Sequence, residues 1–350
     1  KSAQALADEY VNEFDVDFLV GGTSSANAKT VVNNVANETQ TPYMVAPAAA
    51  QSITGSSKTC SDNVFRASET VAMDALSGGK YVANQTDIES VWIYYANYSF
   101  GKDVYTNYKR VLEANGVTVD GSTALAPDYS ADWAGQFQKA VDAGSDGIVG
   151  GFTVAALPAM FSTFLNNRDK YDFAAVGGHA SLAGQTALGQ TFKSALGGLT
   201  KEKIQDAGLG PFTSRYHWNQ YDNEINSAFI DFHTQQYGQF PDLFSGGAFT
   251  AASAIHQAVQ EGGSTNGDDI RNALKGLTVS DTPKGKDAYT FQKYNNQARS
   301  PMTVSDMIPT TEENQKYWGS SAVQPAEPLK TYSKDETTPK KGSEAVTCSL

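Results

Sequence analysis

Two short stretches of small and hydroxyl-bearing residues have the composition of an anion-binding site. The first follows an apolar run at 17–20 and reads Gly21-Gly22-Thr23-Ser24-Ser25-Ala26-Asn27. The second follows the next apolar run and reads Ala46-Pro47-Ala48-Ala49-Ala50-Gln51-Ser52. In doubly wound α/β folds, ligands bind beyond the carboxyl ends of the strands, where helix N-termini present unpaired N–H groups. The two loops therefore predict a carboxylate site with hydroxyl donors; the alternative is that Ser24 or Ser25 is an ordinary helix N-cap.

Residues that would support catalysis or metal binding are scattered. The chain has no G-x-S-x-G, H-E-x-x-H or phosphate-loop motif, and no G-x-G-x-x-G after a strand. His233 and His256 fall within expected helices and are interpreted as packed or surface residues. His179 and His217 lie near a strand end and a crossing between domains, where a ligand contact or structural hydrogen bond is a better interpretation than catalysis. We expect no enzyme activity, no cofactor and no metal site.

Apolar runs alternate with helical patterns over the first half of the chain. Strands are expected at 17–20, 42–46, 64–66, 90–95, 117–119, 147–149 and 173–176, and helices at 28–35, 70–82, 101–115, 131–143 and through 165. Near-continuous apolar strands that alternate with helices are typical of parallel sheets covered on both faces, so we predict an α/β protein with two doubly wound, Rossmann-like lobes. Later segments are mainly helical, at 224–237, 244–261 and 268–277, with late strands at 289–292 and 302–307. These helices are expected to return to the first lobe.

Length and charge set the broad class. The 350 residues are more than one core usually fills, which indicates two domains. With 26 Lys+Arg against 38 Asp+Glu, the net charge of −12 argues against a nucleic-acid partner, because phosphate binding needs a basic patch. No run approaches 18 consecutive apolar residues, so no membrane span is expected.

Two cysteines, Cys60 and Cys348, are predicted to form a disulfide. Cys348 lies in a polar, Pro-containing tail (319–350) that composition alone would class as a disordered linker. A bridge to Cys60 would hold the tail down and indicates an extracytoplasmic location; the alternative is two unrelated buried thiols. Sequons at Asn37, Asn84 and Asn97 are candidate glycosylation sites, although such triplets also arise by chance.

Five segments share their order and spacing with one known family. They are Asp17–Ser25 (DFLVGGTSS), Pro42–Ala49 (PYMVAPAA), Asn63–Ser68 (NVFRAS), Val91–Gly101 (VWIYYANYSFG) and Asp146–Phe152 (DGIVGGF). Together they resemble the type I periplasmic binding proteins, specifically the branched-chain amino acid and amide receptors of ABC importers. The resemblance runs from residue 1 to about 307 and is strongest before 178. Some members also join a cysteine before the F-R strand to one at the C-terminus, as Cys60 and Cys348 would.

The resemblance implies a two-lobed clamp with a hinge of three crossings that closes on a small solute. Residues 1–67 and 215–297 would form lobe 1, residues 68–214 and 298–318 lobe 2, and residues 319–350 a tail that returns to lobe 1 through Cys348. The solute's carboxylate would be held from lobe 1, and an aromatic ring at Phe152 would pack on the solute from lobe 2; a plain core role for Phe152 is the alternative. The implied carboxylate contacts are Ser24, Ser25, Ala48, Ala49 and Ala50. Further implied contacts are Tyr98, His179, Tyr216 and Trp218.

Four departures from the family pattern bear on the ligand and on the chain's extent. Ala50 stands where the family often carries Thr, and Asn97 where it usually carries Asp. No acidic residue is identified that would pair with an α-ammonium, so an amino acid, an aromatic or aliphatic acid and an amide all stay open. Family members also begin with a strand–helix–strand segment, and we expect roughly 40–60 further N-terminal residues in the native protein, which would also carry any lipid anchor.

The leading functional hypothesis is a monomeric, extracytoplasmic receptor that clamps a small carboxylate-bearing molecule and passes it to the membrane permease of an ABC importer. The alternative is the ligand-sensing domain of a receptor, or a secreted scaffold, that uses the same clamp without transport.

Overall fold

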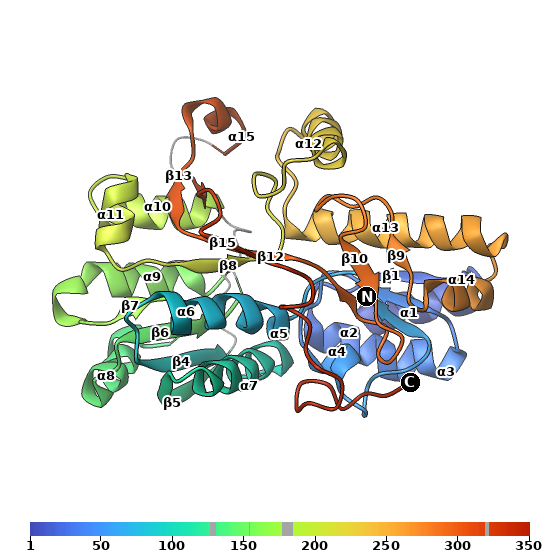
Figure 1. Cartoon of the computed structure of the whole chain (residues 1–350), viewed down its shortest axis with the longest axis horizontal. Helices are drawn as coiled ribbons and strands as arrows, with labels where there is room; N and C mark the ends of the chain where they lie inside the picture. Colours follow the sequence, from blue (N-terminus) through green and yellow to red (C-terminus); the bar gives the residue numbers. More distant parts are fainter. Residues whose placement is uncertain (127–130, 154, 177–184, 319–321) are drawn as a thin grey trace.

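The chain folds into two lobes that are joined by a bridge of extended strands (Figure 1). A computed structural model describes residues 1–126, 131–153, 155–176, 185–318 and 322–350. Each lobe is built on a parallel sheet with helices packed against it, as the alternation of apolar runs and helical patterns predicts. The predicted α/β architecture with two Rossmann-like lobes is therefore confirmed.

The first lobe combines the N-terminal segment with later parts of the chain. Its parallel sheet has the order β1-β2-β3, and a small antiparallel sheet has the order β11-β10-β9. The first part comprises α1 (Ala3–Asn12), β1 (Leu19–Gly21), α2 (Ser25–Val31), the π-helical turn η1 (Val32–Ala36), α3 (Asn37–Thr39), β2 (Tyr43–Val45), α4 (Ser52–Gly55) and β3 (Val64–Arg66). The returning part comprises α12 (Glu224–Tyr237), α13 (Leu243–Gly262), α14 (Gly267–Leu274), β9 (Thr278–Val279), β10 (Tyr289–Phe291) and β11 (Ala298–Arg299).

Alternating side chains of the first-lobe strands pack on opposite faces of the sheet. Tyr43 and Val45 of β2 join the α1 and α2 side chains on one face. Met44, between them, joins the α13 and α14 side chains on the other. This two-residue period buries both faces, which explains why the strand reads as continuously apolar. β1 forms one edge of the sheet, and the Val20 side chain on it is 53% exposed.

The second lobe has a four-stranded parallel sheet with the order β5-β4-β6-β7. Val91 and Ile93 of β4 face α7, and Tyr94 on the opposite face joins an aromatic core with Phe137. Its elements are α5 (Val71–Asp74), the π-helical turn η2 (Ala75–Gly79), α6 (Lys80–Gln85), β4 (Ser90–Ala96), α7 (Ser99–Ala114), β5 (Thr118–Leu125), α8 (Trp133–Ala143), β6 (Gly147–Gly151), α9 (Leu157–Asn166), η3 (Arg168–Lys170), β7 (Ala174–Ala175), α10 (Gln185–Ala195), α11 (Lys201–Asp206), β13 (Met307–Pro309), η4 (Glu312–Asn314), α15 (Gln315–Trp318) and β14 (Val323–Pro325). None of the helices in the described ranges is long and apolar enough to cross a bilayer.

A third sheet lies between the lobes. Its antiparallel strands are β8 (Phe212–Ser214), β12 (Met302–Ser305) and β15 (Lys330–Tyr332), and β12 is in the middle. Figure 1 shows β8 and β12 extending from the left lobe toward the right one. Because paired strands resist shearing but bend across their plane, this sheet suits a hinge between two rigid bodies.

From residue 322 onward the C-terminal tail is ordered, contrary to what its composition alone indicates. β14 pairs with β13 in the second lobe, and β15 pairs with β12 in the hinge. The last residues reach the first lobe, where the amides of Thr347 and Cys348 both donate to the carbonyl of Gly55 at 2.9 Å. Cys348 is joined to Cys60 by the predicted disulfide, which closes a sequence separation of 288 residues. Backbone pairing and this covalent link thus replace the hydrophobic content that the tail lacks.

Candidate ligand-binding site

A cavity of about 1080 Å³ opens between the lobes and continues along the free edge of β1. Its interlobe end is lined from the first lobe by the loop before α2, by Pro47 and Ala49, and by Leu243 and Phe244 at the start of α13. The second lobe contributes Tyr98, Phe100, Thr153 and Ala155, and Arg215 follows β8 at the hinge. The other end lies against the apolar face of α1. Only the interlobe end is lined from both lobes, so a bound solute there is the one that closure would enclose.

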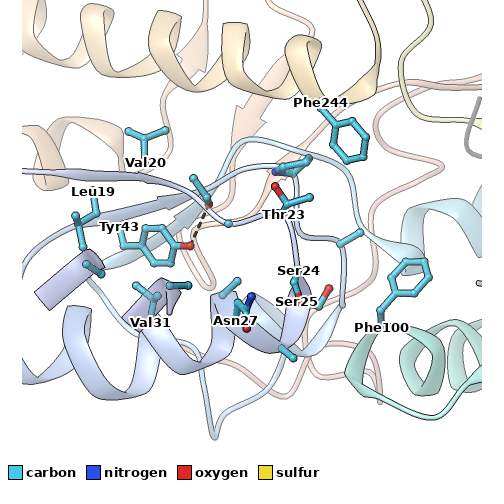
Figure 2. A pocket seen from close by; sticks show the side chains of 18 of the residues that line it. Leu19, Val20, Thr23, Ser24, Ser25, Asn27, Val31, Tyr43, Phe100 and Phe244 are labelled. Carbon is cyan, nitrogen blue, oxygen red and sulfur yellow. Dashed lines mark hydrogen bonds between the residues drawn. The ribbon is translucent and has the colours of Figure 1, made fainter. Parts of the chain in front are cut away.

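The loop before α2 presents its two serines differently (Figure 2). Ser25 is buried, and its hydroxyl accepts a hydrogen bond from the amide of Ala50 at 3.1 Å. Ser24 is the N-cap residue of α2, but its side chain makes no capping hydrogen bond. The N-cap alternative thus describes the backbone position of Ser24 and leaves its hydroxyl available. Gly22, just before, has φ +96°, and a Cβ there would collide with the Tyr43 hydroxyl, so this turn needs glycine.

The second loop has one amide that points to a ligand role. The amide of Ala48 donates to Gly22 at 2.9 Å and that of Ala50 to Ser25, so both hold the two loops together. The amide of Ala49 has no hydrogen-bond partner among the described residues, and Ala49 lines the cavity. Of the three alanines predicted to hold a carboxylate, Ala49 is therefore the one placed to donate to it, while Ala48 and Ala50 lie outside the cavity lining.

A fully buried arginine fixes the shape of this loop from behind. Arg66 of β3 donates from Nη1 to the carbonyls of Ala48 at 3.2 Å and Ala50 at 2.6 Å, and from Nη2 to Thr54 at 2.6 Å. Its Nε donates to the side chain of Gln297. Burial lowers the pKa of Arg66, but a guanidinium stays charged at neutral pH. By binding the carbonyls, Arg66 turns the opposite side of the loop, with the Ala49 amide, toward the cavity.

Replacing Ser25 by alanine is expected to lower the free energy of unfolding by about 1–3 kcal/mol, because the buried Ala50 amide then loses its acceptor. Urea unfolding followed by circular dichroism measures the change. Ser24→Ala is the matched control and should change stability by less than about 0.5 kcal/mol, since that hydroxyl has no partner within the described part of the chain. Equal losses in the two variants would contradict this assignment of roles.

The other predicted contacts are divided by the structure. Tyr98 lines the cavity. Phe152 is buried in the second-lobe core, with its ring 5.2 Å from that of Trp133, although the next residue, Thr153, reaches the cavity. Tyr216 is buried, and its hydroxyl donates to Asn226 at 2.8 Å. His179 lies outside the described residues.

Trp218 belongs to a second place where the lobes meet. Its ring stacks on Phe240 with centroids 4.0 Å apart, and Phe240 contacts Tyr317 of the second lobe at 4.3 Å. The neighbouring His217 is buried, and Nδ1 lies 2.6 Å from the Asn219 side chain. Burial lowers the pKa of His217 to about 3, so the ring is neutral at physiological pH. The hydrogen bond of His217 to Asn219 is of the structural kind that the sequence indicated for this residue as an alternative to a ligand contact.

Phe100, Phe244 and Arg215 were not predicted from the sequence as cavity residues. Figure 2 shows Phe100 on α7 and Phe244 on α13 beside the open end of the Thr23–Ser25 loop. Phe100 lies two residues after Tyr98, within the segment Val91–Gly101 that resembles the family, so the sequence contained a signal for it. Phe244 begins the helix expected at 244–261, and Arg215 stands where the chain is expected to return to lobe 1, so neither was predicted to line a cavity. No local pattern marks them because their neighbours come from distant parts of the chain.

A polar contact joins the lobes beside the cavity. The Asp103 carboxylate on α7 accepts from the Ser52 amide at 2.9 Å and from the Ser52 hydroxyl at 2.6 Å at the start of α4. The second lobe thus supplies an acidic group to the N-terminus of a first-lobe helix, where backbone amides lack partners. An opening movement that separates α4 from α7 would break this contact.

Replacing Asp103 by alanine is expected to shift the lobes toward the open form by about 10–100-fold, because hydrogen bonds to a charged acceptor contribute about 1.5–3 kcal/mol. Small-angle X-ray scattering of the ligand-free protein should show a larger radius of gyration. Asp103→Asn, which keeps one acceptor oxygen, should fall between the wild type and the alanine variant. An unchanged scattering curve for Asp103→Ala would show that this contact does not hold the lobes together.

The described residues include no group of three or more His, Cys, Asp or Glu side chains placed to hold a metal ion. Of the sequon asparagines, Asn84 and Asn97 are exposed and Asn37 is half-buried. Glycosylation of these sites stays a prediction. The described cavity lining offers hydroxyls, the Ala49 amide, the Asn27 carboxamide and one guanidinium among aromatic and aliphatic walls.

A two-lobed α/β clamp with a strand hinge and a cavity between its lobes defines a solute-binding protein. The family model for periplasmic binding proteins matches residues 1–311, and the chain belongs to that family. It is a family of solute-binding receptors that act outside the cytoplasm. This confirms the resemblance drawn from the five sequence segments.

Solved structures of the same fold are similar over nearly the whole chain. A periplasmic binding protein from Burkholderia mallei is 19% identical, with a TM-score of 0.77, and the match covers 99% of this chain and 84% of that one. A solute-binding protein from R. palustris in complex with 4-hydroxybenzoate is 18% identical, with a TM-score of 0.76 and coverage of 95% and 82%. A leucine-, isoleucine-, valine-, threonine- and alanine-binding protein from Brucella ovis, in a closed conformation, is 19% identical, with a TM-score of 0.75 and coverage of 97% and 83%. The comparison with curated proteins gave no match.

Proposed function

We propose that this protein is a receptor that binds a small carboxylate-bearing molecule between its lobes and delivers it to the membrane permease of an ABC importer. The observation that carries the proposal is the interlobe end of the cavity, where the Ser24 hydroxyl and the Ala49 amide face aromatic side chains of the opposite lobe. Structural neighbours are named as ABC transporter proteins that bind amino acids or aromatic acids, which supports the same class of solute.

Ligand binding is tested by thermal unfolding against a panel of leucine, 4-hydroxybenzoate, 4-methyl-2-oxopentanoate and 4-hydroxybenzamide. A ligand at 100 times its Kd adds about 2.7 kcal/mol of stability, so the midpoint should rise by about 4 °C. Ser24→Ala should weaken binding about tenfold without changing the midpoint of the free protein, since its hydroxyl serves only the ligand. If no compound in the panel raises the midpoint and native mass spectrometry finds no co-purified small molecule, the proposal is wrong.

The importer role is tested separately from binding. The ligand-loaded protein should bind the permease in reconstituted membranes and stimulate its ATPase, whereas a sensing domain would bind a signalling receptor instead. Asp103→Ala offers a matched variant, because it leaves the cavity lining intact but disfavours the closed form that would be presented to the permease. Binding of solute without any permease stimulation would favour the sensing alternative.

A further inference from the structure

Arg215 is the only charged side chain among the described residues that line the cavity. It directly follows β8, where the chain passes from the second lobe to the first. Its side chain is 6% exposed, so the guanidinium is largely removed from bulk solvent. A cation in this position strongly influences which solutes can enter, because charges interact more strongly where water is excluded.

The guanidinium is held along one edge by a buried carboxylate. Nε of Arg215 lies 3.0 and 3.2 Å from the two carboxylate oxygens of Asp74, and Nη2 lies 2.5 Å from Oδ2. Asp74 on α5 is fully buried and makes this contact from behind the cavity. Nη1 has no hydrogen bond to any described residue. The pair therefore has a fixed orientation, and its remaining donor is available to a bound group.

Three acidic groups at the hinge and between the lobes are engaged in other contacts. Asp74 binds Arg215, Asp103 binds Ser52, and Glu69 forms an ion pair with Lys284 at 2.7 Å. No Asp or Glu is among the cavity-lining residues within the described ranges. A solute ammonium would thus be buried without a counter-charge, which is costly, whereas the cavity lining offers a solute carboxylate the Arg215 guanidinium, the Ser24 hydroxyl and the Ala49 amide.

We propose that Arg215, held in place by Asp74, is the specificity-determining residue of this site and selects carboxylates that carry no cationic group. The class comprises aromatic acids, 2-oxo acids and simple aliphatic acids, and it excludes α-amino acids. This inference rests on the proposed solute-binding function and narrows the substrate class that the sequence left open. Burial would lower the pKa of Arg215, but the charges of Asp74 and Glu69 raise it, so the guanidinium stays protonated.

Isothermal titration of the whole chain with matched ligands tests the proposal. The first pair, 4-methyl-2-oxopentanoate and leucine, differs by the amine; the second, 4-hydroxybenzoate and 4-hydroxybenzamide, differs by the charge. At least one acid should bind 100-fold more tightly than its partner. Leucine that binds measurably and as tightly as its 2-oxo acid, or an amide that binds measurably and as tightly as its acid, would overturn the inference but leave the proposed function standing. If none of the four binds, native mass spectrometry of the purified protein decides: a co-purified solute with a cationic group overturns this inference alone, and no co-purified small molecule overturns both.

Variants assign the selectivity to the arginine. The double variant Arg215→Gln/Asp74→Asn removes both charges while keeping hydrogen-bonding groups, which avoids an unpaired buried carboxylate. It should bind the preferred acid at least 100-fold more weakly and the matching uncharged amide within threefold of the wild type. An unchanged affinity for the acid would overturn the role of Arg215. If the double variant does not fold by circular dichroism, the wild-type ligand pairs and Arg215→Lys, expected to lose about tenfold for the acid alone, decide the question.

Discussion

Replacing Glu69 by alanine is expected to lower the free energy of unfolding by about 3–5 kcal/mol, because it leaves a buried ammonium without a counter-charge. Glu69 follows β3 at the first crossing between the lobes, and its carboxylate lies 2.7 Å from Nζ of Lys284. The Lys284 side chain is fully buried, and that of Glu69 is 4% exposed. The hydroxyls of Tyr289 and Ser300 donate to the same carboxylate oxygen. Urea unfolding with linear extrapolation measures the loss.

The double variant Glu69→Gln/Lys284→Met is the control for this prediction. It removes both charges together, so it should recover most of the stability lost in Glu69→Ala, to within about 1–2 kcal/mol of the wild type. If the single and double variants are equally unstable, packing rather than charge pairing accounts for the loss. A loss below about 1 kcal/mol for Glu69→Ala would contradict the prediction outright.

The same pair makes stability depend on pH at the acid end. Burial alone would raise the pKa of Glu69, but the Lys284 ammonium and the hydrogen bonds outweigh it, and the pKa is lowered from 4.5. A carboxyl whose folded pKa is lowered contributes its full stability above pH 4.5, and the contribution is lost as pH falls through the lowered value. Unfolding free energy measured from pH 6 down to pH 3 should therefore decrease more steeply for the wild type than for the double variant.

Removing the disulfide is expected to have the second large effect. The Cys60→Ser/Cys348→Ser variant should lose roughly 2–5 kcal/mol, below the limit of about 6 kcal/mol that loop entropy sets for a closure of 288 residues. The bridge constrains the unfolded chain, while in the folded state it holds Ala345, whose carbonyl accepts from the Gln51 side chain at 3.0 Å. Gln51 follows the alanine loop at the cavity, so loosening the tail should also weaken solute binding.

Comparison of the oxidised wild type, the wild type in reductant and the double serine variant checks this prediction. The reduced protein and the variant should unfold at the same lower denaturant concentration, and hydrogen exchange should speed up at residues 345–348 and 51–55. Ser343→Ala in the same tail is a matched control, since its hydroxyl bonds only within the local turn. Unfolding of all three forms at one denaturant concentration would show that backbone contacts alone hold the tail.

The charged groups at the hinge connect stability with selectivity. Glu69–Lys284 joins the first crossing to the first lobe, and Asp74–Arg215 joins α5 to the second crossing. Both pairs are buried, which makes single substitutions costly and gives each cation one orientation. Of these four side chains, only Arg215 lines the cavity. Because Asp74 holds Arg215 in one orientation, the guanidinium has the same position at the cavity in every closed molecule.

Much of the fold was predictable because its signals are local. The expected helix at 224–237 matches α12 (Glu224–Tyr237) at both ends, where Asn223 caps the start and Gly238 ends it with φ +67°. The helix expected at 70–82 forms with a π-helical turn at Ala75–Gly79, where the two glycines had weakened the pattern. Burial of both strand faces, capping and glycine stops depend on residues a few positions apart, so the sequence contains them directly.

The site shows what the sequence by itself determined and what only the tertiary structure decided. The small-residue loops at 21–27 and 46–52 were sufficient to predict one wall of the cavity, because strand ends and helix starts can be predicted from residue spacing. The separate roles of Ser24 and Ser25 could not be predicted from the sequence, because they depend on the hydrogen bond between Ser25 and the Ala50 amide, 25 residues away. Arg215 depends on Asp74, 141 residues away, and on a cavity lined by both lobes. Sequence patterns report which faces are buried, but charge pairing and cavity shape arise only where distant segments meet.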